Sequence, residues 1–423
     1  MDGTVAADPA VTAAVAEAHR REWAFVLAAT VRLTRDLDLA EECVQEAYAK
    51  ALSAWASRGV PARPGAWLTT VAKRCALDLL RREATLRRSL PLLLDESAQS
   101  KAHESVPHEE GGPQAEIPDD RLRLIFTCCH PALAPEAQVA LTLRLVCGLT
   151  TAEVARAFLL KEPTMAARIT RAKKKIAAAR IPYRVPPAEE LPARIDAVLT
   201  VVHLLFTTGH TAPAGEDLVR RDLVERSLDL ANMLRALLPE DADVAGLLAL
   251  ILLTDARRAS RLTDDGRLVL LADQDRTRWD HEAISEGVAL VSEALGHRPP
   301  GRFALMAAIS AVHSEAPTYG ETNWREVVAL YDLLIQLWPS PVVALNRAVA
   351  VGLADGPDAG LAALDALAAE PQLAGYGYLA AARGDFLTRL GRTAEARACY
   401  EEALLLTANA VERDFLATRL RQL

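Results

Sequence analysis

The sequence predicts an all-α protein, and three observations support this fold class. Half of the 423 residues are apolar, Ala and Leu are the commonest, and only 5% are aromatic, a composition that favours helices. Apolar residues recur at helical spacing in the longer segments. Stretches rich in Pro and Gly, such as 57–65, separate these segments. A chain of this length can form two to four domains, each with its own core.

Several features argue against a secreted or membrane-bound protein. Residues 1–18 lack the basic segment that begins a signal peptide. No apolar run reaches the roughly 18 residues of a membrane span. The six cysteines form no regular framework, which indicates reduced thiols. We therefore expect a cytoplasmic protein.

Charge is distributed unevenly along the chain, which has a net charge of −8. Residues 1–184 sum to about +4 and residues 185–423 to about −12. Within 161–184 there are eight basic residues and one acid, Glu162. A basic half joined to an acidic half indicates nucleic-acid binding together with a second role.

The first two predicted helices cover 14–32 and 40–55. The apolar side of the first includes Trp23, with Phe25 on or near it, and the second keeps helical spacing from Ala40 to Trp55, Leu52 included. Acidic and amide residues gather at the start of the second helix, where the helix dipole favours them. They form either a protein-docking face or a face that serves solubility. These residues are Asp36, Asp38, Glu41, Glu42, Gln45 and Glu46.

A third predicted helix covers 66–88, after the break at 57–65. An aromatic side chain near its start, a loop before it and basic residues along it would suit a protein that holds unstacked bases and a phosphate backbone. Trp67 can equally be a core residue, because it is spaced to pack with Val71. The basic residues of the last half of this helix are Lys73, Arg74, Arg81, Arg82, Arg87 and Arg88.

Residues 91–118 show little periodicity and are predicted to be a flexible linker. A compact helical domain is expected over 119–184, with a scaffold helix over 135–145 that Gly148 ends. Cys128, Cys129 and His130 are consecutive and cannot converge on one tetrahedral zinc ion. They are interpreted as buried side chains, together with Cys147.

Residues 150–176 predict a helix-turn-helix. Thr150 and Glu153 form a capping box that begins one helix, and Pro163 suits the first turn of the next. A core stripe on the second helix leaves a basic face for base edges and phosphates. The alternative is an ordinary pair of amphipathic helices with a solvated lysine run. The stripe consists of Met165, Ile169, Ala172 and Ile176.

These segments, in order and spacing, resemble regions 2 and 4 of extracytoplasmic-function (ECF) sigma factors over roughly residues 10–180. The resemblance implies that residues 10–90 form region 2 and 119–184 region 4. It implies that the acidic face from Asp36 to Glu46 docks on the β′ clamp helices of core RNA polymerase. Two positions depart from the family pattern: Arg74 stands where many members have Asn, and Leu159 stands where the helix-turn-helix usually has Gly.

The resemblance also implies two contacts with promoter DNA. The third helix and the loop before it would melt and read the -10 element, and the second helix of the helix-turn-helix would read the -35 element. The implied -10 residues are Arg63, Trp67, Lys73, Arg74, Asp78, Arg81 and Arg82. The implied -35 residues are Thr164, Ala166, Ala167, Arg168, Arg171, Lys173, Lys174 and Lys175.

The acidic C-terminal half is predicted to be helical, with one domain over 188–300 and another over 301–423. Trp324–Leu334 matches Thr393–Ala403, and a weaker unit lies near 359–367, a period close to that of tetratricopeptide (TPR) repeats. Such repeats would offer a concave surface to a protein partner. The cluster Asp273, Asp275, Arg276, Trp279 and Asp280 is interpreted as a salt-bridged interdomain latch or a ligand or protein site.

The sequence therefore predicts a bacterial alternative sigma factor, with no cofactor, no metal and no membrane contact, located with the nucleoid in the cytoplasm. Its expected partners are core RNA polymerase and promoter DNA, and a protein is the candidate partner for the TPR-like surface. Its C-terminal extension would inhibit or support its activity. The rival hypotheses are a TPR-type scaffold, a helix-turn-helix regulator outside polymerase, and an all-α enzyme, for which no acid–base or nucleophile arrangement is visible.

Overall fold

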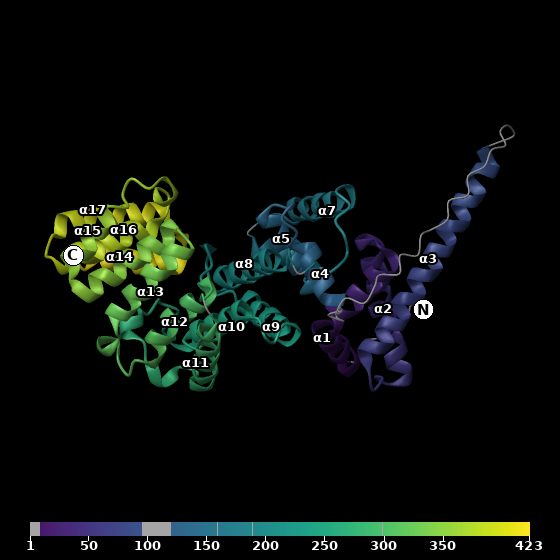
Figure 1. Ribbon diagram of the computed structural model, residues 1–423, viewed down its shortest axis with the longest axis horizontal. Helices are drawn as coiled ribbons and strands as arrows, with labels where there is room; N and C mark the ends of the chain where they lie inside the picture. Colours follow the sequence, from purple (N-terminus) through teal and green to yellow (C-terminus); the bar gives the residue numbers. More distant parts are fainter. Residues whose placement is uncertain (1–8, 95–119, 159, 188, 298) are drawn as a thin grey trace, which may run out of the picture. The chain divides into compact units, whose positions relative to one another are not determined.

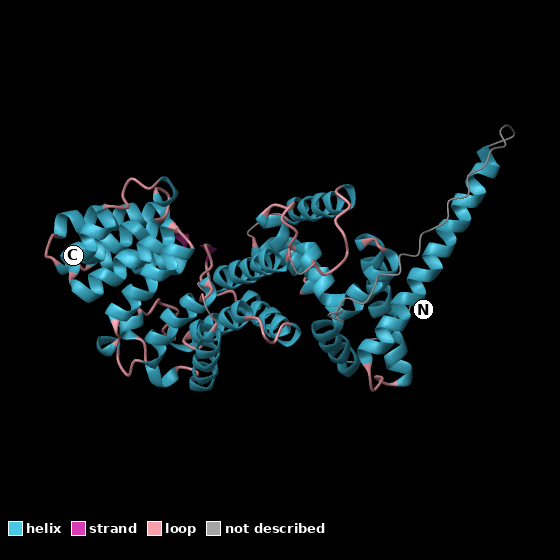
Figure 2. Ribbon diagram, viewed as in Figure 1, coloured by secondary structure: helices cyan, strands magenta, loops and turns pink. Residues whose placement is uncertain are grey.

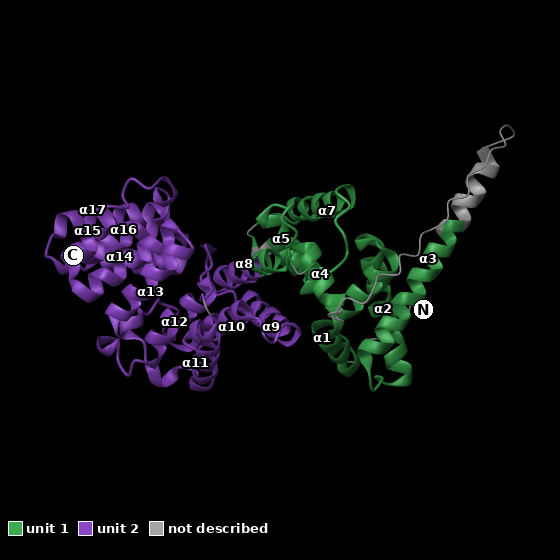
Figure 3. Cartoon of the chain, in the orientation of Figure 1, with its two compact units in different colours: residues 1–198 green, residues 199–423 purple. Residues whose placement is uncertain are grey.

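The protein divides into two compact units, residues 1–198 and 199–423 (Figure 3). The computed structural model describes residues 9–94, 120–158, 160–187, 189–297 and 299–423. Helices account for nearly all its regular structure (Figure 2), so the predicted all-α class is confirmed. Each unit is treated below on its own.

Three long helices open the first unit (Figure 1): α1 Pro9–Thr34, α2 Leu37–Arg58 and α3 Pro64–Leu94. All three pack on one another. The Asp36 carboxylate caps α2 by accepting hydrogen bonds from the backbone N–H groups of Asp38 and Leu39, at 2.8 and 2.9 Å. Gly59 ends α2 with a φ of +79°, a left-handed conformation that glycine adopts without a steric penalty.

The second part of the first unit holds α4 Asp120–Cys128, α5 Pro135–Leu141, α6 Thr151–Ala157 and α7 Glu162–Ala178. The predicted scaffold helix over 135–145 is only partly correct, because its second half is a π-helical turn over Thr142–Val146. Gly148 follows with a φ of +73°. A Cβ atom there would lie 2.9 Å from the His19 and Trp23 rings, so glycine lets this turn approach α1.

Three expectations about the first unit were wrong in detail. The side chains of Phe25 and Leu52 are each 42% exposed, although both were assigned to apolar faces. The third helix runs to Leu94, so residues 91–94 belong to a helix and not to the predicted linker. The remaining residues of the predicted linker, 95–118, lie outside the described residues. Leu159 also lies outside them.

The second unit continues from α8, which begins in the first unit, and it is helical throughout its described part. Each helix from α11 to α18 packs against the next one along the chain. Two short strands, β1 Ala214–Gly215 and β2 Ala408–Asn409, pair in parallel. Short 3-10 turns cover 258–260, 271–273, 276–278, 319–321 and 371–373. The helices are α8 Leu191–His210, α9 Arg221–Leu237, α10 Ala242–Asp255, α11 His281–Gly296, α12 Arg302–Glu315, α13 Trp324–Leu337, α14 Pro341–Asp355, α15 Pro357–Asp365, α16 Gly377–Arg389, α17 Thr393–Leu406 and α18 Ala410–Arg421.

The α8 helix is long and apolar enough to cross a membrane by length and composition, with a mean hydropathy of 1.3. The helix is not an uninterrupted apolar run, because Arg194 and Asp196 lie within it, so no apolar run of about 18 residues is present in it, as expected. Its apolar side chains are used in the protein core instead: Val198, Leu199, Val202 and Phe206 are all at most 2% exposed. Burial in the core explains why a helix of a folded domain can carry this composition.

Three imidazoles of the second unit have pKa values displaced by burial. Burial, assisted by neighbouring arginines, lowers the pKa of His203 and His313 to about 4 and that of His210 well below its usual value. These rings are therefore neutral in the folded protein at pH 7.

We expect the stability of the second unit to fall as pH decreases from about 6.5 to 4. Between these pH values the three histidines bind protons in the unfolded chain but not in the folded one. For each histidine, the free energy of unfolding should therefore be lower at pH 4 than at pH 7 by on the order of 1 to 3 kcal/mol. Thermal unfolding of the full chain at pH 7.5, 6 and 5 measures this. His203→Gln should flatten the decrease, whereas the exposed control His281→Gln should not; equal slopes for both variants would contradict it.

Candidate nucleic-acid interface

The helix-turn-helix has the local geometry that the sequence predicts. The Glu153 carboxylate accepts from the Thr150 backbone N–H at 2.7 Å, and the Thr150 hydroxyl accepts from the Glu153 N–H at 3.2 Å, so the capping box is confirmed. Pro163 lies in the first turn of α7. The α7 side chains predicted as a core stripe are all buried: Met165, Ile169, Ala172 and Ile176.

The opposite face of α7 is exposed and basic. Arg171, Lys174 and Lys175 are exposed, and Thr164, Ala166 and Ala167 lie at the exposed start of the helix. Arg168 is half-buried because its guanidinium carbon lies 5.9 Å from the centroid of the Phe158 ring on the preceding segment. Stacking holds this side chain beside the exposed face, where a base or phosphate could meet it.

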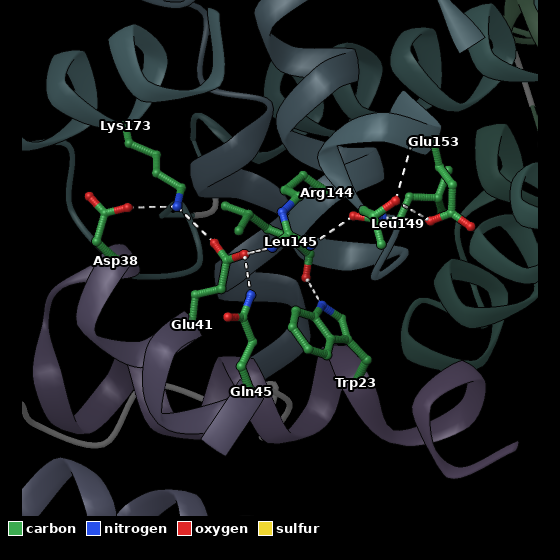
Figure 4. A network of polar contacts seen from close by, with 10 residues as sticks. Trp23, Asp38, Glu41, Gln45, Arg144, Leu145, Leu149, Glu153 and Lys173 are labelled. Atoms are coloured by element: carbon green, nitrogen blue, oxygen red, sulfur yellow. Dashed lines mark hydrogen bonds and ion pairs between the residues drawn. The ribbon is translucent and has the colours of Figure 1, made fainter. Parts of the chain in front are cut away.

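Lys173 differs from the other predicted DNA-binding residues of α7. Its side chain is only 10% exposed, and its ammonium donates hydrogen bonds to Asp38 at 2.7 Å and Glu41 at 2.8 Å. Both acceptors lie on α2 (Figure 4). A residue predicted for DNA and two residues predicted for polymerase therefore bind each other.

Glu41 is the centre of this network and is not exposed as expected. Its side chain is 8% exposed and forms ion pairs with Lys173 and with Arg144 of the π-helical turn. Gln45 donates a hydrogen bond to the same carboxylate at 3.3 Å. Arg144 also donates to the Leu149 carbonyl at 2.8 Å (Figure 4). A buried carboxylate with two cationic partners is stable only while both partners remain in place.

Further contacts join the same two parts of the first unit. The Trp23 indole N–H donates to the Leu145 carbonyl at 3.0 Å, and the Arg144 guanidinium carbon lies 5.9 Å from the Trp23 ring centroid. The Tyr183 hydroxyl donates to the Ala28 carbonyl at 2.9 Å. Helices α1 and α4 also pack directly. The contact between α1–α3 and α4–α7 is thus a specific packed interface with polar side chains at its centre.

The remaining acidic residues of α2 lie on its accessible side. Asp36 serves as the cap of the helix, and Glu42, Gln45 and Glu46 are exposed. The Glu46 carboxylate pairs with Lys50 at 3.2 Å. Among the residues predicted for protein docking, Glu41 is the one that the fold buries.

The residues predicted to bind the unpaired DNA strand lie on α3 and the loop before it. Arg63, Arg74, Asp78, Arg81 and Arg82 are exposed, and Lys73 is half-buried. Trp67 is half-buried too, and its ring packs edge-on against Trp55 with a centroid distance of 5.7 Å. Trp67 therefore contributes to the core and keeps part of its surface accessible. Asp78 pairs with Arg81 at 3.7 Å.

Two adjacent cysteines of the first unit, Cys128 and Cys129, are buried. Burial raises the pKa of Cys128 and of Cys129, and the Cys129 thiol hydrogen-bonds the Thr142 hydroxyl. Within the described ranges, no group of three His, Cys, Asp or Glu side chains could hold a metal ion. A buried thiol with a raised pKa is a poor ligand, because thiolates bind metals.

Four of the five residues predicted as a latch or ligand site have structural roles in the second unit, and the fifth, Asp273, lies in the 3-10 turn 271–273. Asp275 and Asp280 cap the helical turns that follow them, and the buried Trp279 donates to the Ser260 hydroxyl at 2.8 Å. Arg276 donates to the carbonyls of His313 and Ala316 at the end of α12, at 2.8 and 2.6 Å. Among the described residues no ion pair joins the five to one another, and the Arg276 guanidinium carbon lies 4.4 Å from the Trp279 ring centroid.

Two residues of the interface, Arg144 and Trp23, were not among the sequence-predicted site residues. Arg144 is the only charged residue in the apolar run from Val139 to Val146. A single charge in a buried segment usually has a specific partner, and this signal could have identified it. Its partner could not be found in the same way, because it lies 103 residues earlier in the chain.

Comparison with known proteins matches three parts of the chain to family models. Residues 19–85 match sigma-70 region 2, residues 123–176 match sigma-70 region 4, and residues 194–295 match a family of unknown function, DUF6596. An uncharacterized protein of Rhizobium meliloti, R00370, is 40% identical over 94% of this chain and 93% of its own length. A probable ECF RNA polymerase sigma factor of Mycobacterium tuberculosis, SigI, is 29% identical over 41% of this chain and 58% of its own length.

Proposed function

The chain belongs to the ECF sigma factors, which bind core RNA polymerase and direct promoter-specific transcription initiation, and from that premise we propose that it is held inactive by contact between regions 2 and 4. The observation that carries this proposal is the binding of Glu41 by Arg144 and Lys173. Glu41 belongs to the polymerase-docking face, and Lys173 belongs to the -35-reading helix. Each surface therefore occupies part of the other.

The individual contacts that we propose use the exposed residues of each surface, together with Glu41, which becomes accessible when the contact between regions 2 and 4 opens. Asp36, Asp38, Glu41, Glu42, Gln45 and Glu46 contact the β′ clamp helices. The α7 face around Arg168 and Arg171 reads the -35 element, and the basic face of α3 with Trp67 holds the -10 element. Base contacts supply sequence choice, and phosphate contacts supply salt-dependent affinity.

We call the conformation in which regions 2 and 4 are in contact the closed state. The energetics support a closed state that opens only when a partner binds. Asp38 is 74% exposed, so its pair with Lys173 contributes little. The pairs of Glu41 are buried, and breaking one of them costs about 3 kcal/mol or more if the carboxylate stays buried. Opening exposes Glu41 to water and avoids that cost. The β′ clamp helices would then bind Glu41, and DNA would bind Lys173.

A zero-length cross-link tests the closed state. A carbodiimide condenses an amine with a carboxylate to an amide and is itself converted to a urea, and Lys173 lies within 3 Å of two carboxylates. In the free full-length chain we expect an amide between Lys173 and Asp38 or Glu41, identified by mass spectrometry of the digest. Adding core polymerase and promoter DNA should reduce its yield at least fivefold, an order-of-magnitude expectation from the competition for the same groups.

The Lys50–Glu46 pair is the control for the free chain, because it lies within one helix at 3.2 Å; with polymerase present it is not used, since Glu46 belongs to the proposed docking face. Its cross-link should not depend on the contact between regions 2 and 4. If the Lys173 cross-link is missing in the free chain while the control forms, the closed state is wrong. If it persists in an initiation complex that is active in transcription, the closed state does not control activity.

The C-terminal unit is proposed to regulate or support the sigma factor, and the protein is proposed to act in the cytoplasm at the nucleoid. Two features support a separate role for this unit: its compactness and its acidic charge. The proposed divisions are region 2 at 10–90, linker at 91–118, region 4 at 119–184, a helical domain at 188–300 and TPR-like repeats at 301–423. The matching segments of the repeat fall on α13 and α17, with the weaker unit on α15.

A further inference from the structure

The second unit contains a cavity of about 920 Å³. One side is formed by the end of α8, by Thr254 of α10 and by residues 268–272. The other side is formed by α14, α16 and α18, the alternate helices of the stack. Pockets for small molecules usually measure about 300 to 1,000 Å³, so the volume suits such a ligand.

The two sides of the cavity are tied together by contacts between residues far apart in sequence. The strand pair joins Ala214 to Ala408, and the Asn409 amide donates to the carbonyls of Ala212 at 3.1 Å and Asp217 at 2.9 Å. Asn409 is fully buried. The Arg261 guanidinium also holds the end of α8 by donating to the His210 carbonyl and, at 3.0 Å, to the Thr211 hydroxyl. The cavity is therefore bounded by fixed structure.

The wall between α14 and α16 shows why the space is not filled by collapse of the helices. A Cβ atom at Gly352 or Gly360 would lie within 2.1 or 2.5 Å of the Phe386 ring, so these glycines let the ring wedge tightly between helices. Phe386 is 2% exposed and immobilised by that fit. Most of the lining is apolar or aromatic. Its ring-bearing side chains are His203, Phe206, His210, Tyr319, Tyr376, Tyr378, Phe386, Tyr400 and Phe415.

Charged groups of the lining leave one cation without a carboxylate. Arg389 pairs with Asp385 at 2.8 Å. Glu412 accepts a hydrogen bond from the Tyr378 hydroxyl and lies near the Arg261 charge. Arg419 has its guanidinium carbon 5.5 Å from the Phe415 ring centroid, and no carboxylate among the described residues forms an ion pair with it.

We propose that this cavity binds a small organic carboxylate, with an apolar or aromatic body among the rings and its carboxylate on Arg419. A guanidinium and a carboxylate form a bidentate, charge-assisted pair, which a neutral ligand cannot reproduce. The alternate helices of the stack would otherwise present this face to a protein partner, but α8 and residues 268–272 cover it. A protein interface needs about 800 Å² on each partner, which this covered face does not offer.

Binding to the full chain is measured by titration calorimetry with two matched pairs of probes: decanoate with decanamide, and 1-naphthaleneacetate with 1-naphthaleneacetamide. We expect each carboxylate to bind at least tenfold more tightly than its amide. Arg419→Gln should abolish that preference and leave the amide affinity within about twofold, since a neutral ligand makes no ion pair. Arg419→Lys should keep part of it. The control Arg421→Gln, on an exposed arginine of the same helix, should change nothing.

Filling the cavity locates the binding. Ala382→Trp and, independently, Val349→Phe should each weaken all four probes at least tenfold, and thermal unfolding shows whether the variants remain folded. Equal affinities for carboxylates and amides in the unmodified chain would overturn the assignment of Arg419. Binding that survives both filling variants would place the ligand elsewhere. A lack of binding by any probe would make the cavity a packing void. None of these readouts depends on polymerase or DNA.

Discussion

Replacing Arg144 by methionine should raise the affinity of the protein for core RNA polymerase by roughly tenfold or more. The substitution keeps the apolar stem beside Trp23 and removes one of the two cations that hold the buried Glu41 carboxylate. The closed state then retains a poorly compensated buried charge, whereas the open state exposes that charge to water. When the competent state becomes more populated, the apparent affinity rises in proportion until the open state predominates.

The measurements are binding to core polymerase, transcription at limiting sigma factor, and the radius of gyration by small-angle X-ray scattering. All three should increase together. Trp23→Phe removes the hydrogen bond to the Leu145 carbonyl and part of the buried ring, leaves both cations of Glu41 in place, and should give a smaller change in the same direction. Arg20→Met is the matched control, because it breaks an exposed pair with Glu17 within α1. If Arg144→Met binds polymerase no better than Arg20→Met does, the contact between regions 2 and 4 is not inhibitory.

The double substitution Arg168→Ala and Arg171→Ala should reduce promoter-directed transcription by roughly a hundredfold or more. Each arginine that contacts a base or phosphate is worth about 1 to 3 kcal/mol, and both lie on the exposed side of α7, opposite its core stripe. The dependence of DNA affinity on salt should also become less steep, with a slope smaller by about 2. Binding to core polymerase should stay unchanged, because neither side chain touches α2.

Arg397→Ala supplies the matched control, an exposed arginine on α17 of the C-terminal unit. It should leave transcription and the salt slope as they are. Circular dichroism of the double variant checks that α7 still folds, which its intact core stripe favours. Unchanged transcription from the double variant, in a reconstituted system where the unmodified chain is active, would show that α7 is not the -35-reading helix.

Local patterns were enough to predict the helix-turn-helix in detail. The capping box, the proline in the first turn and the buried stripe of α7 all depend on residues within about one helix length of one another. The buried side of a helix was predicted less well where the element that packs against it was unknown. Phe25 and Leu52 have helical spacing with the core residues, but each is 42% exposed.

The same division applies to the sites. The resemblance and the exposed charges identified which residues could meet DNA and polymerase, because charge type and spacing are local properties. Sequence alone did not show that Lys173 and Glu41 meet each other, or that Arg144 completes the pair, because these residues lie 132 and 103 positions apart. Nor did it reveal the cavity of the second unit, whose lining extends from His203 to Arg419.

The sequence by itself determined the all-α class, the sigma factor regions and the register of α7. Periodicity, capping and motif spacing act over a few turns, so they can be read from neighbouring residues. Only the tertiary structure decided that Glu41 is buried and that a cavity remains beside Arg419. Both outcomes depend on how distant surfaces pack, and ion pairs and voids are properties of that packing, not of the local chain.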